Sequence, residues 1–131
     1  MPVLATGESD RFLNASMGTT TYLATVTPIK LALFTVIGTA AATGTEVVPG
    51  AGSYARQSIT VWTTASGGTG CSNTTVGTFL NMSATTVVAI ELFDSTGSPV
   101  RKWFGPLTAN KTTALGDTLS FAAGSIVLGA T

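Results

Sequence analysis

The sequence predicts an all-β protein: one domain built as a β-sandwich or small barrel of about seven to eight short antiparallel strands, preceded by an extended N-terminal arm. Three observations predict this class. Apolar and β-branched residues recur in short runs with a period of two, and clusters of Gly, Pro and Asp separate these runs. No stretch has the periodicity of a helix longer than a turn, so the apolar faces of the strands must pack on each other. The arm is expected at residues 1–28 and the β-sandwich domain at residues 29–131.

The predicted arm has only weak periodicity. Residues 9–15 are expected to form a single helical turn capped by Ser9, and residues 19–27 are expected to be extended. Two alternatives are open for this arm: it is held loosely, or it docks on a neighbouring subunit. In the second case, the side chains that a partner would bury are Phe12, Leu13, Tyr22 and Leu23.

The stretch from Thr43 to Trp62 is predicted to form a rigid structural corner. The strand before it, residues 30–37, has apolar side chains on both faces, which favours a place in the middle of a sheet. The strand that ends it, residues 57–63, alternates apolar and polar residues. Four side chains of the stretch are unusual for an ordinary loop: Glu46, Tyr54, Arg56 and Trp62. Glu46 and Arg56 are expected to pair and to fix the loop.

The second half of the domain is predicted to contain most of the strands. They are expected at residues 75–82, 86–93, 100–104, 111–115, 118–122 and 125–128. The turn from Asp94 to Pro99 joins two of them into a hairpin, and Asp117 is expected to close a turn with its own carboxylate. Residues 64–75 are expected to be a flexible loop that contains Cys71. Arg101, Lys102 and Trp103 form a small basic and aromatic patch, which is either a solvated strand edge or a contact for an acidic partner.

The composition excludes several classes of function. Charged residues make up 9% of the 131 residues and the net charge is zero, so no basic surface for nucleic acid is expected. No apolar run is long enough for a transmembrane helix. The chain has one cysteine and no histidine, which removes the usual catalytic triads, metal clusters and general bases. We therefore expect no catalytic, cofactor or metal site, and the low charge favours a homo-oligomer.

Several short motifs resemble one known family, in the same order along the chain. They are Leu31-Ala-Leu-Phe-Thr35, Gly44-Thr-Glu-Val47, Tyr54-Ala-Arg-Gln57, Ile90-Glu-Leu-Phe-Asp94, Phe104-Gly-Pro-Leu-Thr108 and Gly116-Asp-Thr-Leu-Ser-Phe-Ala-Ala-Gly124. The family is one of small tailed-bacteriophage virion proteins, many of which are labelled phage tail fibre protein. The resemblance covers roughly residues 30–128 and the arm matches least, while Ser53 is an insertion relative to the family pattern. It implies a non-enzymatic β-sandwich protein of the virion.

Three functions are weighed on this basis. The first is a capsid decoration (cement) protein on the capsid surface, expected to be a trimer, with the major capsid protein as its partner. This capsid function is favoured because the chain is short for a fibre and contains no repeat that could build a fibre shaft. The alternative is a tail, baseplate or tail-fibre module that contacts other tail proteins and has a receptor- or glycan-binding role. A stand-alone glycan-binding sandwich is the third, with Tyr54, Trp62 or Trp103 as the aromatic platform.

Overall fold

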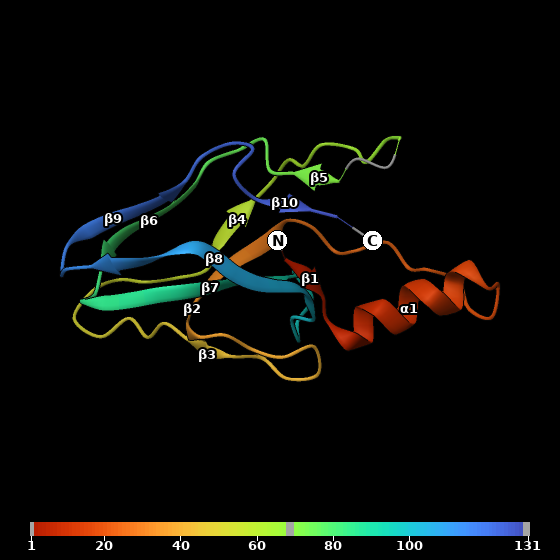
Figure 1. Cartoon of the computed structure of the whole chain (residues 1–131), viewed down its shortest axis with the longest axis horizontal. Helices are drawn as coiled ribbons and strands as arrows, with labels where there is room; N and C mark the ends of the chain where they lie inside the picture. The colour runs from red at the N-terminus through yellow and green to blue at the C-terminus, as the bar shows by residue number, and fades with distance from the viewer. Residues whose placement is uncertain (1, 68–69, 130–131) are drawn as a thin grey trace.

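The structure, a computed structural model, describes residues 2–67 and 70–129 and confirms the predicted all-β class (Figure 1). Its strands form one six-stranded antiparallel sheet and two smaller sheets of two strands each. Residues 68 and 69 of the loop expected at 64–75 lie outside the described residues. The division into an arm and a domain at residue 28 stays a prediction, although residues before it contribute a strand to the large sheet.

The large sheet is built around one central strand. The strands of this sheet, in spatial order, are β1 (Val3–Leu4), β8 (Arg101–Thr113), β7 (Thr85–Phe93), β2 (Ile29–Val36) and β3 (Thr45–Glu46), with β4 (Gln57–Ile59) paired to β2 beside β3. Residues 31–34 of β2 are almost completely buried, and β2 has partners along both of its edges. This confirms the prediction of a central strand from its two apolar faces. The hairpin of β7 and β8 is confirmed as well.

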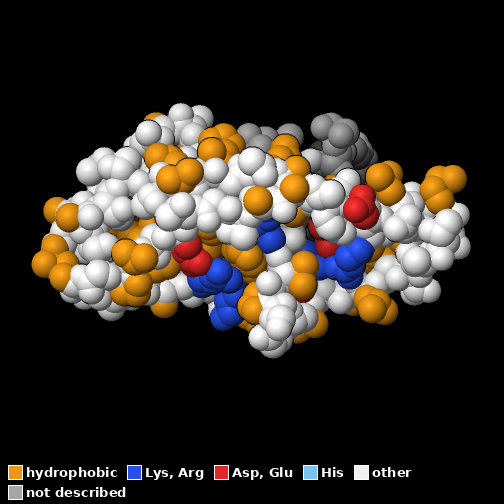
Figure 2. Space-filling model, turned by 90° about the horizontal axis from the view of Figure 1, so that it is seen from below, with side chains coloured by type: hydrophobic (Ala, Val, Ile, Leu, Met, Phe, Trp, Pro, Cys, Tyr) orange, Lys and Arg blue, Asp and Glu red, His pale blue; other side chains and the backbone are white. Residues whose placement is uncertain are grey.

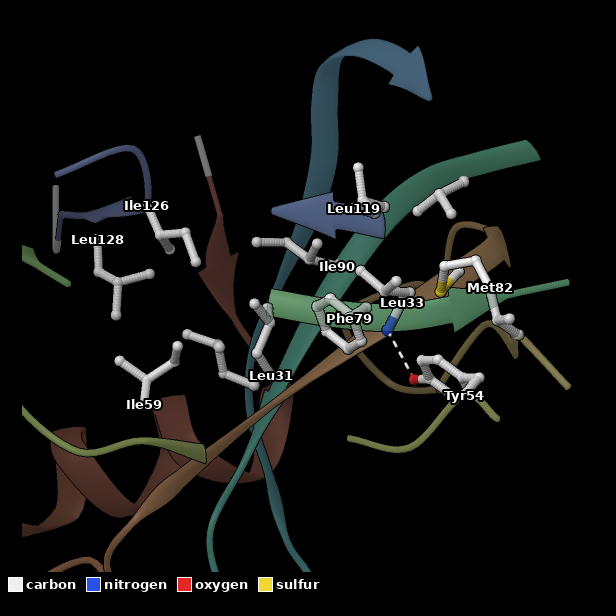
Figure 3. Packing of buried hydrophobic residues seen from close by; sticks show 13 residues of the cluster. Leu31, Leu33, Tyr54, Ile59, Phe79, Met82, Ile90, Leu119, Ile126 and Leu128 are labelled. Atoms are coloured by element: carbon white, nitrogen blue, oxygen red, sulfur yellow. Dashed lines mark hydrogen bonds between the residues drawn. The ribbon is translucent and has the colours of Figure 1, made fainter. Parts of the chain in front are cut away.

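The second layer covers one face of this sheet. It consists of β6 (Gly77–Met82) paired with β9 (Asp117–Phe121), and of β5 (Cys71–Ser72) paired with β10 (Val127–Leu128). Figure 3 shows Leu31, Leu33 and Ile90 from the large sheet meeting Phe79 and Leu119 from the small one. The ring of Phe79 stacks on Tyr54 with 5.7 Å between ring centroids. The molecule is thus a sandwich whose apolar interior lies between the two layers.

The arm differs from its prediction. Where a single turn capped by Ser9 was expected, α1 (Thr6–Ser16) is a helix of 11 residues whose N-cap is Ala5. Its one buried residue is Glu8, so tertiary contacts of a polar side chain, rather than an apolar stripe, hold the helix. A helix of this kind carries no periodic apolar pattern that could predict it from the sequence. Residues 19–27, expected to be extended, are in no strand.

Three strand boundaries were also predicted wrongly. β8 is one strand of 13 residues, although two strands separated by Gly105 and Pro106 were expected. Proline is tolerated in an edge strand, and on its outer side β8 is covered only by the two-residue β1 among the described residues. The strand expected at residues 57–63 ends at Ile59, and Cys71 belongs to β5 rather than to a loop.

Candidate functional site

Three of the four predicted corner residues form one hydrogen-bonded unit. The guanidinium of Arg56 donates to Glu46 through Nε (2.9 Å to Oε1) and Nη2 (2.7 Å to Oε2). The hydroxyl of Tyr54 donates to Glu46 Oε1 at 2.8 Å and accepts from the backbone N–H of Leu33 at 2.9 Å. Because β3 and β4 pair with different parts of β2, Leu33 lies at the gap between them, and the Tyr54 hydroxyl bonds to β2 there. The unit fixes the connection from β3 to β4.

Replacing Tyr54 with phenylalanine is expected to lower the free energy of unfolding by about 1–3 kcal/mol, because the buried N–H of Leu33 would have no acceptor. Urea unfolding followed by circular dichroism measures the loss. Thr86→Val is the control, since it removes a hydroxyl whose contact with Thr112 is exposed, where water can replace it. Equal losses of unfolding free energy in the two variants would contradict the argument that the buried hydrogen bond to Leu33 costs more to remove than an exposed one.

Trp62, the fourth predicted corner residue, lies apart from this unit. It forms an isolated antiparallel bridge with Asn73 and packs partly buried against the main core. Asn73 is 1% exposed, and its side chain donates to the carbonyl oxygens of Thr75 and Ala122 and accepts from the N–H of Ile126. Sequence reasoning missed Asn73, because asparagine in a loop ordinarily indicates a turn.

A buried ionic cluster anchors α1 to the sandwich, and we call it the anchor. Lys102 Nζ lies 2.9 Å from Glu8 Oε2 and 3.7 Å from Asp94 Oδ2, and the three side chains are only 4–6% exposed. Arg11 adds an ion pair to Glu8 at 2.7 Å, and the Tyr22 hydroxyl donates to the other Glu8 oxygen. Glu8 was missed from the sequence, where its only signal is Arg11 three residues further on in a charge-poor chain.

A second buried ion pair fixes the loop of residues 38–44. Arg101 Nη1 lies 3.2 Å from Glu91 Oε1, and the two side chains are 9% and 1% exposed. The same guanidinium donates to the backbone oxygens of Thr39, Ala40 and Ala42. Arg101 and Lys102 therefore do not form the exposed basic patch that was expected for them. Both point into ionic contacts because the register shift near Phe93 places two successive residues of β8 against buried carboxylates.

Acid is expected to weaken the anchor. Burial alone would raise the pKa of the Glu8 carboxyl, but hydrogen bonds from Tyr22 and Lys102 and the charges of Lys102 and Arg11 outweigh it and hold this pKa below its ordinary 4.5. A carboxylate whose pKa is depressed by folding contributes stability above the unfolded-state pKa, and this contribution is lost as the pH falls through the folded-state value. The free energy of unfolding should therefore fall as the pH drops below 4.5.

Urea unfolding from neutral pH down to about pH 2 measures this dependence, and Glu8→Gln is the variant to compare. The slope should be smaller in the variant. It should not vanish, because hydrogen bonds from Val100 and Thr96 outweigh the burial of Asp94 and lower the pKa of that carboxyl too. If the free energy of unfolding depended on pH identically in the two proteins, the Glu8 carboxylate would not contribute to the anchor.

Most of the charged side chains form ion pairs with each other. Four of the six acidic residues and four of the six basic residues lie in ion pairs within the chain. Figure 2 shows the consequence: charged side chains gather in a few small groups, and apolar and uncharged atoms make up most of the face. Such a surface offers little electrostatic repulsion between copies.

Exposed apolar side chains of α1 lie beside β1 and β8, and we call the surface of Val3, Leu4, Phe12, Leu13 and Trp103 the arm patch. Phe12 and Leu13 are 53% and 56% exposed, and they line a hollow together with Val3, Leu4 and Trp103. Of the residues predicted to contact a partner, the structure thus brings together Phe12, Leu13 and Trp103. Leu23 is 70% exposed on the segment that follows α1, while Tyr22 is held by its bond to Glu8. Exposed apolar side chains gathered in this way are typical of protein contacts.

The described residues show neither a membrane-spanning helix nor a group of metal ligands. Within residues 2–67 and 70–129, no helix has the length and hydropathy that crossing a bilayer requires. In the same part of the chain, no three or more His, Cys, Asp or Glu side chains are grouped to hold a metal ion. Tyr54 is 8% exposed and stacks in the core, so its ring is not a platform for a glycan.

Comparison with known proteins identifies a family. The model of the family described as Podophage GP4 fiber I protein gp80 matches residues 5–129. The match includes α1, although the motifs noted in the sequence began only at about residue 30. No match was found among the curated proteins. Since the family model spans nearly all of the sandwich and the anchored helix, the chain belongs to the family of Podophage GP4 fiber I protein gp80, a family of phage virion structural proteins of the fibre type.

Proposed function

We propose that the chain is a non-enzymatic structural subunit of a phage tail fibre and that it contacts its neighbours through the arm patch. The observation that carries this proposal is the family match over residues 5–129, in a family described as a fibre protein. Localisation in the tail follows from that description and is part of the proposal.

The arrangement of polar groups supports a structural role. The chain has no histidine, and its buried carboxylates Glu8, Glu91 and Asp94 are committed to cations or backbone N–H groups that fix the fold. A general acid or base has to reach a substrate in a cleft, and these groups face the interior of the chain. Phe12 and Leu13 of α1, by contrast, are exposed and open to a partner.

Capsid decoration, the function favoured by the sequence, is now the alternative. It shares the requirement for an apolar surface with few charges, but the family description favours the fibre. In the tail fibre or on the capsid surface, the protein would also have a receptor- or glycan-binding role under this alternative. Trp103 at the arm patch is the aromatic side chain that such binding would use.

Quantitative mass spectrometry of purified virions, combined with immunogold labelling, tests the proposal. A fibre subunit should be present in far fewer copies than the major capsid protein, with label at the tail. A copy number comparable with that of the major capsid protein, with label over the head, would support decoration instead. Absence from purified particles would overturn both.

A second measurement connects the location to the arm patch. Phe12→Asp should reduce incorporation into particles, because a charge at the centre of an apolar contact cannot be desolvated without a partner. Val76→Asp, at an equally exposed valine outside the arm patch, is the control and should be incorporated normally. Equal incorporation of the two variants would mean that the arm patch is not the contact.

A further inference from the structure

The anchor holds one buried amine against two buried carboxylates. Lys102 Nζ lies 2.9 Å from Glu8 Oε2 and 3.7 Å from Asp94 Oδ2, and the three side chains are 4–6% exposed. Figure 1 shows how they meet: the turn between β7 and β8, which begins with Asp94, lies beside the start of α1, which carries Glu8. Because buried ions have lost their hydration, a reaction that removes charge from this site is favoured.

The two carboxylate oxygens of Asp94 have different surroundings. Oδ1 accepts hydrogen bonds from the N–H of Val100 at 2.8 Å and from the hydroxyl and N–H of Thr96 at 2.8 and 3.3 Å. Oδ2 faces Lys102 Nζ at 3.7 Å, which is longer than a hydrogen bond. Donors that converge on one oxygen stabilise the negative charge that develops there when a nucleophile adds to the carboxyl carbon. The Asp94 carboxyl is therefore arranged as an acceptor for the amine.

Glu8 is placed to move a proton. Its Oε2 lies within hydrogen-bond distance of Lys102 Nζ, and the same oxygen pairs with Arg11 at 2.7 Å. An amide between Lys102 and Asp94 would remove one positive and one negative charge from the site. Glu8 would keep Arg11 as its cation, so the reaction would leave no buried carboxylate without a compensating charge.

We propose that Lys102 and Asp94 become joined by an isopeptide bond after the chain has folded, with Glu8 as the group that transfers the proton. The reaction is a condensation within one chain and takes place once, so it needs no cleft for a substrate and does not make the protein an enzyme. The bond ties the end of β7 to the start of β8 beneath α1. The proposal concerns the chain itself and does not depend on its place in the virion.

The atoms and charges of this condensation balance. The Lys102 ammonium first gives a proton to Asp94 Oδ2, which leaves a neutral amine and a neutral carboxylic acid. Nζ then adds its electron pair to Cγ, and the charge that develops on Oδ1 is held by the donors of Val100 and Thr96. Glu8 takes a second proton from Nζ and passes it to Oδ2, the Cγ–Oδ2 bond breaks, and Oδ2 leaves as water. The product is a secondary amide, and no oxidant, reductant or cofactor takes part.

Folding positions the two groups. The N–H of Asp94 donates to the carbonyl of Val100 at 3.0 Å, and the register shift between β7 and β8 turns Lys102 inward. Reacting groups that are held together need no bimolecular encounter. Burial raises the pKa of the Asp94 carboxyl, but hydrogen bonds from Val100 and Thr96 and the charge of Lys102 outweigh it and leave this pKa below its ordinary 3.8. The ion pair described above is thus the unreacted state, and the bond should accumulate slowly.

Intact-mass spectrometry under denaturing conditions tests the bond, because an amide survives unfolding and an ion pair does not. The full chain is purified in urea, refolded and sampled over time. The folded chain should lose the mass of one water molecule, and the chain kept in urea should keep its full mass. Lys102→Arg retains the positive charge without an amine, and this variant should lose nothing. Lys111→Arg, at an exposed lysine, is the matched control and should lose water as the wild type does.

The role of Glu8 is tested by the rate of water loss. Glu8→Gln can still accept a hydrogen bond but has no carboxylate to take up the proton, so we expect the rate to fall at least about a hundredfold. Circular dichroism establishes that the variant is folded. Glu46→Gln removes a carboxylate from the ion pair with Arg56, which lies outside the anchor, and should react at the wild-type rate.

Tryptic peptides locate the bond. Trypsin cleaves after lysine and arginine, so in the linked chain the cut after Lys102 is lost and peptide 102–111 stays attached to peptide 57–101. Attachment to peptide 1–11 would place the bond at Glu8 and would overturn the assignment of Asp94 as the acceptor. Water loss with normal cleavage after Lys102 would indicate a cyclic imide at an aspartate and would overturn the proposal as a whole.

Three further outcomes would contradict the proposal. They are an unchanged mass after prolonged incubation of the folded chain, the same water loss in Lys102→Arg, and an equal rate in Glu8→Gln and Glu46→Gln. The location of the protein in the virion is measured separately, so these outcomes leave the assignment to the fibre unaffected.

Discussion

Replacing Lys102 with alanine is expected to lower the free energy of unfolding by about 3–5 kcal/mol, a large part of the total stability of a small domain. Lys102 is 3% exposed and lies between the carboxylates of Glu8 and Asp94. Without its ammonium group, two buried negative charges would lose the cation that compensates them. The loss exceeds that of an ordinary surface lysine, because the carboxylates cannot be rehydrated without moving α1.

Urea unfolding measures this effect, and hydrogen exchange of the α1 amides locates it. Exchange in α1 should accelerate more than exchange in β2, because the anchor holds the helix and not the central sheet. Lys111→Ala is the matched control: Lys111 is exposed, and its replacement should change stability by no more than about 0.5 kcal/mol. A loss below about 1 kcal/mol for Lys102→Ala would mean that water already solvates the anchor.

Replacing Arg101 with alanine is expected to cost a similar amount, about 3–5 kcal/mol. Glu91 is 1% exposed, and its Oε2 has no hydrogen-bond partner among the described residues, so Arg101 is its compensating charge in that part of the chain. Three backbone oxygens of the loop from Thr39 to Ala42 would each lose one of their donors at the same time. The loop should then become more susceptible to proteolysis, because its remaining hydrogen bonds are mostly within the loop itself.

Arg56→Ala provides a comparison with the same side chain in a more exposed pair. Arg56 and Glu46 are 32% and 29% exposed, and Arg56 also lies 4.0 Å above the ring of Phe93. We expect a loss of only about 1–2 kcal/mol, because water can solvate the carboxylate that remains. Equal losses at Arg101 and Arg56 would contradict the argument that burial decides the cost of an unpaired carboxylate.

The distribution of charge links stability to assembly. Buried ion pairs are weak contributors to stability compared with apolar packing, yet they fix one arrangement of the groups that they join. Here they fix the direction of α1 and the loop at residues 38–44. They also remove charges from the surface, which leaves the apolar arm patch without much repulsion to prevent contact between copies.

Much of the sandwich could be predicted from the sequence, because the signals are local. Alternation of apolar residues identified β7 and β6, and the two apolar faces of residues 30–37 identified the central strand. Turn chemistry was equally local: the Asp94 carboxylate accepts hydrogen bonds from Thr96 and from the N–H of Val100, and that of Asp117 accepts one from Ala114. Short motifs were sufficient to indicate a family of phage virion proteins.

Tertiary structure alone decided the anchor and the path of β8. Lys102 and Glu8 are 94 positions apart, and no local pattern shows that a register shift in β8 turns a lysine of an apparent edge towards a helix of the arm. Hydrophobic periodicity records which side of a segment is buried, but the partner of a buried charge is determined by contacts between distant segments, and these form only when the chain has folded.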